Sequence, residues 1–144
     1  MNPKPDHGEK SYKGSGKLEG RKAIITGRDS GIGRAVAIAF AREGADVLIA
    51  YLREEADALE TGALIEAEGR KAILTKCDIQ RAETCREIAK RAAKEFGQID
   101  ILVNNAALQA AFTSLGDISD EEWDLTFRVN IHAMFYLTKA PCLI

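Results

Sequence analysis

The glycine-rich segment at residues 26–33 constrains the fold of this chain more than any other part of the sequence. It follows an apolar, strand-like stretch at 22–26, leads into a helix-like stretch at 34–42, and reads Thr26-Gly27-Arg28-Asp29-Ser30-Gly31-Ile32-Gly33. A glycine-rich turn between a strand and a helix directs backbone N–H groups and the positive end of the helix dipole at an anion. The segment therefore predicts a loop that binds the pyrophosphate of a dinucleotide.

Each glycine of this loop has its own expected role. Gly27 permits the tight turn, Gly31 lets the backbone approach the phosphates, and Gly33 lets the helix pack closely on the strand. The alternative is a plain strand–helix turn without a ligand. The other expected members of the binding loop are Arg28, Ser30 and Ile32.

The hydrophobic pattern predicts alternating strands and helices. Strands are expected at 22–26, 46–51, 71–77 and 100–103, and helices at 31–43, 54–68 and 82–96. In the first helix, the residues expected to face the sheet are Ala35, Val36, Ala39 and Phe40. A capping box at 119–122 opens a last helix that runs to about residue 140, where Pro141 is expected to end it.

Right-handed crossovers between these elements give a parallel sheet with strand order 3-2-1-4. The expected fold class is therefore α/β, a Rossmann-type doubly wound sheet that is truncated after its fourth strand and the following helix. Residues 18–144 predict one dinucleotide-binding domain. Residues 1–17 are polar, hold all but one of the prolines, and predict a flexible N-terminal arm, or alternatively an arm that wraps a neighbouring subunit.

Composition excludes several classes of function. The net charge is −2 and no basic stripe is present, which argues against nucleic-acid binding. No apolar run reaches membrane-spanning length and no apolar signal segment is visible, so we expect a cytoplasmic protein without a membrane partner. Cys77, Cys85 and Cys142 are expected to be free thiols, and two histidines far apart argue against a metal site.

Two further motifs give the sequence a family resemblance. An apolar run at 101–103 leads into Asn104-Asn105-Ala106-Ala107, and Asn130 lies in Arg128-Val129-Asn130-Ile131. With the Thr-Gly-x-x-x-Gly-x-Gly pattern at 26–33, these motifs resemble the short-chain dehydrogenase/reductase family over about residues 18–140. The family reads Asn-Asn-Ala-Gly after its fourth strand, so Ala107 is a mild departure. Residues 3–9 and 12–18 resemble the N-terminal extension of its glucose/ribitol dehydrogenase-like, general-stress subgroup.

The resemblance implies roles for residues beyond the glycine-rich loop. It places Asp78 and Ile79 near the adenine, although Asp78 could equally cap the following helix. It implies that the ribose on the nicotinamide side is lined by Asn105, Ala106 and Ala107. Asn130 matches the asparagine of the catalytic set, and the alternative is an asparagine that bonds to the backbone of the fourth strand.

The rest of the family's catalytic set is expected to be missing. Family enzymes use a Ser, a Tyr and a Lys four residues after the Tyr, because a phenol needs a nearby cation to act as a base at neutral pH. The residues four positions after Tyr12, Tyr51 and Tyr136 are Gly16, Glu55 and Ala140. Tyr136 and Lys139 are only three apart and are interpreted as structural or surface residues. We therefore expect an N-terminal cofactor half that is inactive by itself.

The last residues suggest why this half stands alone. The family pattern here is Lys-Ala-Ala-Leu-Pro-His-Leu-Lys, whereas this chain ends Lys139-Ala140-Pro141-Cys142-Leu143-Ile144. Removing one g from gcg-gcc-ctg-cct-cat-ttg gives gcg-ccc-tgc-ctc-att-tga, which encodes Ala-Pro-Cys-Leu-Ile and a stop. We expect a frameshifted gene product, and an intact in-frame continuation in the gene would overturn this hypothesis.

The expected cofactor is NADP or NAD, with NADP favoured. An acidic residue at the end of the second strand would hold the ribose 2′-OH of NAD, but Tyr51 occupies this position. Arg53 or Arg28 could pair with a 2′-phosphate, unless both are simply solvated. The resemblance implies a homo-oligomeric parent oxidoreductase acting on a sugar, polyol or other small carbonyl compound. The alternatives for this chain are a non-catalytic dinucleotide-binding module, a subunit-interaction fragment or a non-functional product.

Overall fold

The computed structural model describes residues 6–27 and 31–143 and contains a four-stranded parallel sheet. Its strands are β1 (Lys22–Thr26), β2 (Asp46–Tyr51), β3 (Ala72–Lys76) and β4 (Ile101–Asn104). Their order is β3-β2-β1-β4, which confirms the predicted topology and α/β class. Thr26 pairs in register with both Ala50 and Asn104, so the carboxyl ends of the strands meet at one edge.

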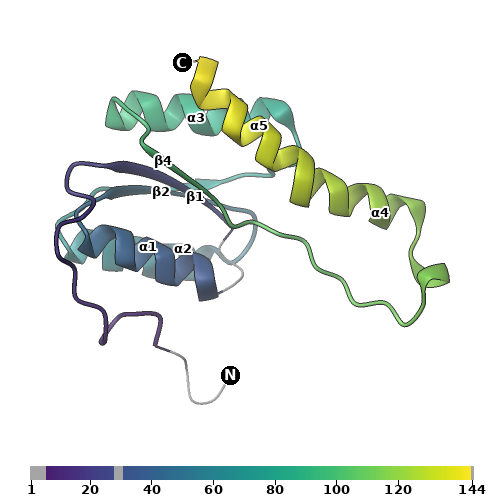
Figure 1. Cartoon of the computed structure of the whole chain (residues 1–144), viewed down its shortest axis with the longest axis horizontal. Helices are drawn as coiled ribbons and strands as arrows, with labels where there is room; N and C mark the ends of the chain where they lie inside the picture. The colour runs from purple at the N-terminus through teal and green to yellow at the C-terminus, as the bar shows by residue number, and fades with distance from the viewer. Residues whose placement is uncertain (1–5, 28–30, 144) are drawn as a thin grey trace.

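Helices cover both faces of the sheet (Figure 1). Helices α1 (Gly31–Arg42) and α2 (Glu55–Ala67) lie on one face, and α3 (Ala82–Phe96) and α5 (Ala133–Lys139) lie on the other. Successive strand residues point to opposite faces. The α3 side accordingly contains Ile24, Leu48, Ala50, Ile73, Cys85, Ile88, Ala92 and Leu137, and the α1 side contains Ile25, Ala37, Ala41, Val47, Ile49 and Ile65.

The buried stripe of α1 differs from the predicted one. Ala37, Ile38 and Ala41 are its most buried apolar residues, each at most 2 % exposed. Val36 and Phe40 do pack against the core, but only from its margin. Ala35 and Ala39 are only half-buried. The buried stripe is shifted because α1 packs on α2 and the N-terminal arm as well as on the sheet, and the periodicity of α1 alone does not reveal these neighbours.

The predicted last helix is interrupted. Ser119 caps α4 (Asp120–Phe127) in the expected box, in which its hydroxyl accepts from the Glu122 amide. A π-helical turn, η2 (Arg128–His132), then joins α4 to α5. Pro141 lies inside the 3₁₀ turn η3 (Ala140–Leu143) that continues α5, because a proline ends the α-helical hydrogen bonding without preventing a tighter turn.

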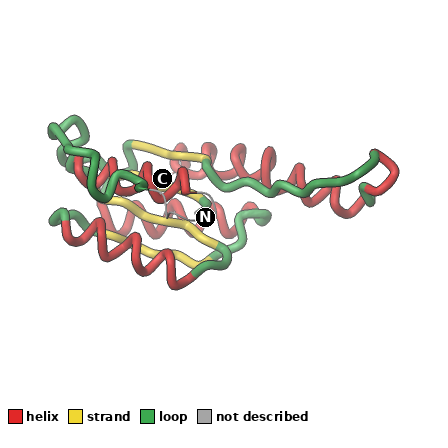
Figure 2. Tube along the Cα trace, turned by 90° about the horizontal axis from the view of Figure 1, so that it is seen from below, coloured by secondary structure: helices red, strands yellow, loops and turns green. Residues whose placement is uncertain are grey.

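Helix α4 extends away from the sheet, together with the loop before it that contains the 3₁₀ turn η1 (Leu115–Asp117) (Figure 2). Among the described residues, none in α4 is buried. Trp123 is 54 % exposed and packs against Phe127 of the same helix, with ring centroids 4.8 Å apart and the rings tilted by 41°. β4 forms one edge of the described sheet, so an open strand edge and a helix with exposed apolar side chains occur in the same domain. None of the described helices combines the length and apolarity needed to cross a membrane.

The described part of the N-terminal arm, residues 6–17, contains neither a strand nor a helix and lies along α1. The Arg42 guanidinium binds the backbone carbonyls of Gly8, Glu9 and Tyr12. Glu43 accepts from the Tyr12 hydroxyl and, at 2.9 Å each, from the amides of Ser15 and Lys17. The end of α1 therefore holds this segment on its own domain. Its flexibility when isolated stays a prediction.

Candidate functional site

Residues from all four strands meet at the carboxyl edge of the sheet. Gly27 follows β1, Tyr51 ends β2, Asp78 follows β3 and Asn105 follows β4. The order reverses between β1 and β4, because β2 and β3 lie on one side of β1 and β4 on the other. Such a reversal leaves a crevice at the carboxyl ends of the strands, where ligands of α/β sheets bind. The structure thus brings the separate sequence candidates to one edge.

Gly27 makes the closest backbone contact at this edge. It has φ +73°, and a Cβ at this position would lie 2.3 Å from Ala106 Cα. The Asn105 side chain donates from Nδ2 to the Gly27 carbonyl at 2.6 Å, and the Ala106 amide donates to the Thr26 hydroxyl at 3.3 Å. The glycine-rich turn and the segment after β4 are therefore one packed unit that needs a glycine at position 27.

The start of α1 presents an accessible N-terminus. Ile32 is 67 % exposed, whereas Gly33 is buried. The first turn of α1 carries no acidic residue that would compete for its free N–H groups. Two predicted contacts, Arg28 and Ser30, lie outside the described residues.

Two candidate residues lie at the end of β2: Tyr51 is buried and Arg53 is exposed. Tyr51 is only 7 % exposed, and its carbonyl accepts from the Cys77 amide at 2.8 Å. Arg53 is exposed and forms no ion pair with another described residue. Between Arg53 and α2, Glu54 adopts φ +40°, an uncommon conformation for a residue other than glycine. This turn directs the chain from the edge into α2.

The segment after β3 is held locally. Asp78 accepts from the backbone amide of Gln80 at 3.1 Å, two residues later, so it forms a turn and does not cap α3, whose N-cap residue is Arg81. Ile79 packs against the core on the α3 side, and its carbonyl accepts from the Cys85 thiol at 3.3 Å.

The cysteines at this end of the sheet are unsuited to nucleophilic catalysis. Burial raises the pKa of Cys77 to about 12 and that of Cys85 to about 11, so both stay protonated at neutral pH. The described residues also contain no group of three or more metal-ligating side chains.

Asn130 joins the last helix to the segment after β4. Its Nδ2 donates to the Leu108 carbonyl at 2.9 Å, and its Oδ1 accepts from the Leu108 amide at 2.7 Å. The asparagine lies in the π-helical turn η2, and such turns are frequent at functional sites. The structure thus shows that Asn130 binds backbone, while its place in a catalytic set stays a prediction. Its bonds go to the segment just beyond the fourth strand. Ala107, one residue before Leu108, is exposed.

Sequence reasoning missed Asn104 and a cluster that includes Arg34. Asn104 Oδ1 is buried and has no hydrogen-bond partner among the described residues. Arg34 is 6 % exposed in the first turn of α1, where it binds Glu9 of the N-terminal arm and Glu60 of α2 at 2.9 Å each. The hydrogen bond to Glu60 raises the pKa of Arg34, which keeps it charged. The sequence signal that could have revealed this cluster was the charged residue Arg34 among the apolar residues of α1.

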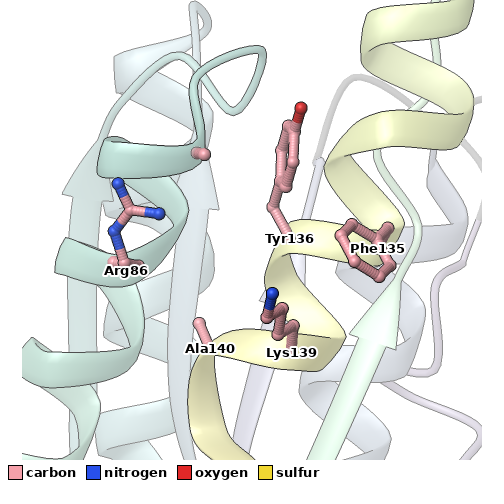
Figure 3. A pocket seen from close by; sticks show the side chains of 6 residues that line it. Arg86, Phe135, Tyr136, Lys139 and Ala140 are labelled. Carbon is pink, nitrogen blue, oxygen red and sulfur yellow. The ribbon is translucent and has the colours of Figure 1, made fainter. Parts of the chain in front are cut away.

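Tyr136 and Lys139 line a pocket of about 160 Å³ between α3 and α5 (Figure 3). Arg86 of α3 faces them across it. The Lys139 ammonium lies 5.5 Å from the centroid of the Phe135 ring. Lys139 thus packs on the face of Phe135. This arrangement agrees with the interpretation of Tyr136 and Lys139 as structural or surface residues.

Comparison with known proteins places this geometry in a family. The sequence matches the short chain dehydrogenase family over residues 21–143. It is 52 % identical over 141 residues to the uncharacterized oxidoreductase YhxD of Bacillus subtilis (strain 168), covering 97 % of this chain and 47 % of that protein. It is 37 % identical over 145 residues to the glucose and ribitol dehydrogenase of Daucus carota, covering 96 % of this chain and 50 % of the relative.

A solved structure supports membership of the same family. A short chain dehydrogenase from Burkholderia cenocepacia J2315 in complex with NADP superimposes with a TM-score of 0.79 and 36 % identity, over 88 % of this chain and 51 % of that one. The chain spans about half the length of the curated relatives it matches. The chain belongs to the short-chain dehydrogenase family of oxidoreductases.

Proposed function

We propose that this chain is the dinucleotide-binding half of an NAD(P)-dependent oxidoreductase. Its parent would act on a sugar, a polyol or another small carbonyl compound, and would assemble as a homo-oligomer. The chain alone would bind the dinucleotide without turning over a substrate.

The contact between Gly27 and Ala106 carries this proposal. It brings the glycine-rich turn and the segment after β4 to one edge, with Asn105 hydrogen-bonded across them. A dinucleotide needs this juxtaposition, because its pyrophosphate lies at the start of α1 while its two halves lie on either side of β1. The NADP bound to the Burkholderia cenocepacia relative supports the same ligand class.

The residues present fit such a ligand. The exposed first turn of α1 would donate backbone N–H groups to the phosphates, and Ile32 would cover them. The orphaned Asn104 Oδ1 offers a buried acceptor beside β1. When bound, the dinucleotide supplies the hydride that is exchanged with the substrate.

Arg53 supports a preference for NADP. It is exposed just beyond β2 without an ion-pair partner among the described residues, and no carboxylate at position 51 repels a 2′-phosphate. We expect Arg53→Ser to weaken binding of NADPH several-fold while binding of NADH changes little. Equal losses for both dinucleotides would contradict this preference.

Catalysis by the chain alone is not expected. General acid–base groups typically contribute ~10²–10⁴-fold to rate, and no tyrosine of this chain is followed by a lysine four residues later. Lys139 lies over Phe135, so we do not assign Tyr136 and Lys139 as an acid–base pair.

Titration of the purified chain with NADPH and NADH tests the proposal. We expect saturable quenching of Trp123 fluorescence or enhancement of dinucleotide fluorescence, and a raised melting temperature, without substrate-dependent oxidation. As a matched control, Lys13→Ala removes an exposed charge far from the edge and should leave binding unchanged. A well-folded chain that binds neither dinucleotide would overturn the proposal.

A second candidate function is a subunit-interaction fragment. Trp123, Ile131 and Phe135 are each at least 54 % exposed along α4, η2 and α5, which favours association with another polypeptide. Mixing the chain with full-length YhxD and measuring mixed oligomers by native mass spectrometry tests this. Separate elution of both chains at micromolar concentration would exclude it.

A further inference from the structure

The N-terminal arm reaches the start of α1 through His7. A Cβ on Gly31 would lie 2.7 Å from His7 Nε2 and 3.0 Å from Cδ2, so the imidazole occupies the space next to the first residue of α1. The side chain of His7 is 15 % exposed. Gly31 is therefore a glycine at least in part because a histidine from the arm packs on it, a reason that the sequence pattern does not contain.

A buried cation fixes the position of this histidine. Glu9 Oε1 accepts from Arg34 Nε at 2.9 Å and lies 3.3 Å from His7 Nδ1, while Glu9 Oε2 accepts from the His7 amide at 2.5 Å. Arg34 is in turn bound by Glu60 of α2. The histidine is thus connected through Glu9 and Arg34 to the body of the domain.

This connection determines which ring nitrogen faces α1. A carboxylate only accepts hydrogen bonds, so Glu9 favours a proton on Nδ1 of His7. Nε2 then points toward Gly31 as the free nitrogen. An anion has only acceptor atoms to offer, so one at the start of α1 would be bound by the form of His7 that carries a proton on both ring nitrogens and donates from Nε2.

We propose that His7 is part of the phosphate site: the arm forms an additional wall of the dinucleotide site, and the His7 imidazolium binds the pyrophosphate beside the N-terminus of α1. This inference rests on the proposed function, because it requires a dinucleotide at that edge. Glu9 and Arg34 are positioning residues that act through His7. Within residues 6–27 and 31–143, the charged group that contacts the His7 ring is Glu9 from the arm; Arg34 from α1 binds Glu9, and Glu60 from α2 binds Arg34.

The contact itself is tested without any ligand. Gly31→Ala introduces a methyl group against the His7 ring and should lower the unfolding midpoint. In a double-mutant cycle, His7→Ala should relieve part of this loss, since the two residues compete for the same space. Additive effects of the two substitutions would show that His7 does not pack on Gly31, and would overturn the inference.

The binding role is tested by calorimetry with NAD⁺, whose pyrophosphate does not titrate near neutral pH. In the wild-type chain we expect affinity to fall as the pH rises from 6 to 8, because binding takes up a proton on His7. His7→Gln should bind about tenfold more weakly at pH 6, with little dependence on pH. Glu9→Gln should also weaken binding at pH 6, because it removes the carboxylate that positions the His7 ring through Nδ1.

The outcomes separate this inference from the proposed function. Lys13→Ala, an exposed change on the same arm, should bind like the wild type at every pH. If the wild type binds NAD⁺ and His7→Gln binds equally well or more tightly, the phosphate role of His7 is wrong while the proposed function stands. If His7→Gln weakens NADPH but not NAD⁺, the pyrophosphate assignment is wrong. If no variant and no wild-type sample binds a dinucleotide, both proposals are wrong.

Discussion

At the scale of single residues, the glycines of the loop owe their identity to contacts with distant parts of the chain. Position 27 needs a positive φ and also the absence of a side chain, because Ala106 packs against it. Position 31 faces His7. The sequence motif identifies both positions, but the residues that exclude a Cβ there are 79 and 24 positions away in the chain.

Gly27→Ala should therefore destabilise the domain more than a positive φ alone explains. Gly69 is the matched control, because it has the same φ of +73° with open space around its Cβ position. We expect Gly69→Ala to lower the free energy of unfolding by roughly 1–2 kcal/mol. Gly27→Ala should cost ~1–3 kcal/mol more, because Ala106 must move. Urea denaturation of both variants measures the difference, and equal losses would contradict a close contact at Gly27.

At the scale of elements, polar side chains attach irregular segments to the regular layers. Asn130 holds the segment after β4 through the backbone of Leu108. Glu43 and Arg42 hold the N-terminal arm at the end of α1. The segment after β4 lies at the rim of the candidate site, so the bonds from Asn130 that contribute to stability also shape the place where a ligand would enter.

Asn130→Ala should release the segment after β4. The substitution leaves the amide and the carbonyl of Leu108 without these partners, which costs ~1–3 kcal/mol for each buried group that water does not reach. Hydrogen exchange at the Leu108 amide should accelerate. Asn130→Asp is the matched control, because it keeps the acceptor for that amide and replaces the donor to the Leu108 carbonyl with a carboxylate oxygen. Unchanged exchange in Asn130→Ala would contradict the bridging role.

Acid should detach the N-terminal arm at Glu43. The hydrogen bond from Tyr12, followed by those from the Lys17 and Ser15 amides, lowers the pKa of Glu43 to about 2 from an ordinary 4.5. Its contribution is therefore complete above pH 4.5 and is lost as the pH falls toward about 2. NMR shifts of the Ser15 and Lys17 amides should follow this transition, and Glu43→Gln should abolish it. A transition centred near pH 4.5 would argue against these bonds.

At the scale of the whole molecule, the centre of the sheet is well covered, whereas its β4 edge is open. β2 lies between β1 and β3 and is almost fully buried, whereas every residue of β4 is only partly buried. Helix α4 extends beyond the sheet with its aromatic residues exposed (Figure 1). An open strand edge beside exposed apolar side chains favours association with other chains.

Trp123→Lys should accordingly reduce self-association with little effect on folding. Trp123 packs on Phe127 within α4, which contributes no described residue to the core, so we expect a change in unfolding free energy within about 0.5 kcal/mol. Light scattering at increasing concentration measures the association. Leu137→Ala, at a core position that is 2 % exposed, should by contrast cost about 2–5 kcal/mol. A large stability loss in Trp123→Lys would show that α4 packs on more than its own helix.

The sequence by itself determined the layers of this protein. The strands, the 3-2-1-4 order, the Ser119 capping box and the glycine-rich loop were all predicted, because they follow from local periodicity, turn residues and the handedness of crossovers. The family also followed from three short motifs in order. The same motifs predict a dinucleotide site at the carboxyl edge of the sheet. Such features depend on residues close to each other in the chain.

Only the tertiary structure decided which distant residues meet. The π-helical turn at Asn130, the buried stripe of α1 and the orphaned Asn104 oxygen depend on packing between elements. The placement of His7 over Gly31 also depends on Arg34 and Glu9, which lie in different segments of the chain. Periodicity reports only which side of one element is apolar. It contains no information about which segment will cover that side, because that choice depends on the free energy of the whole packed chain.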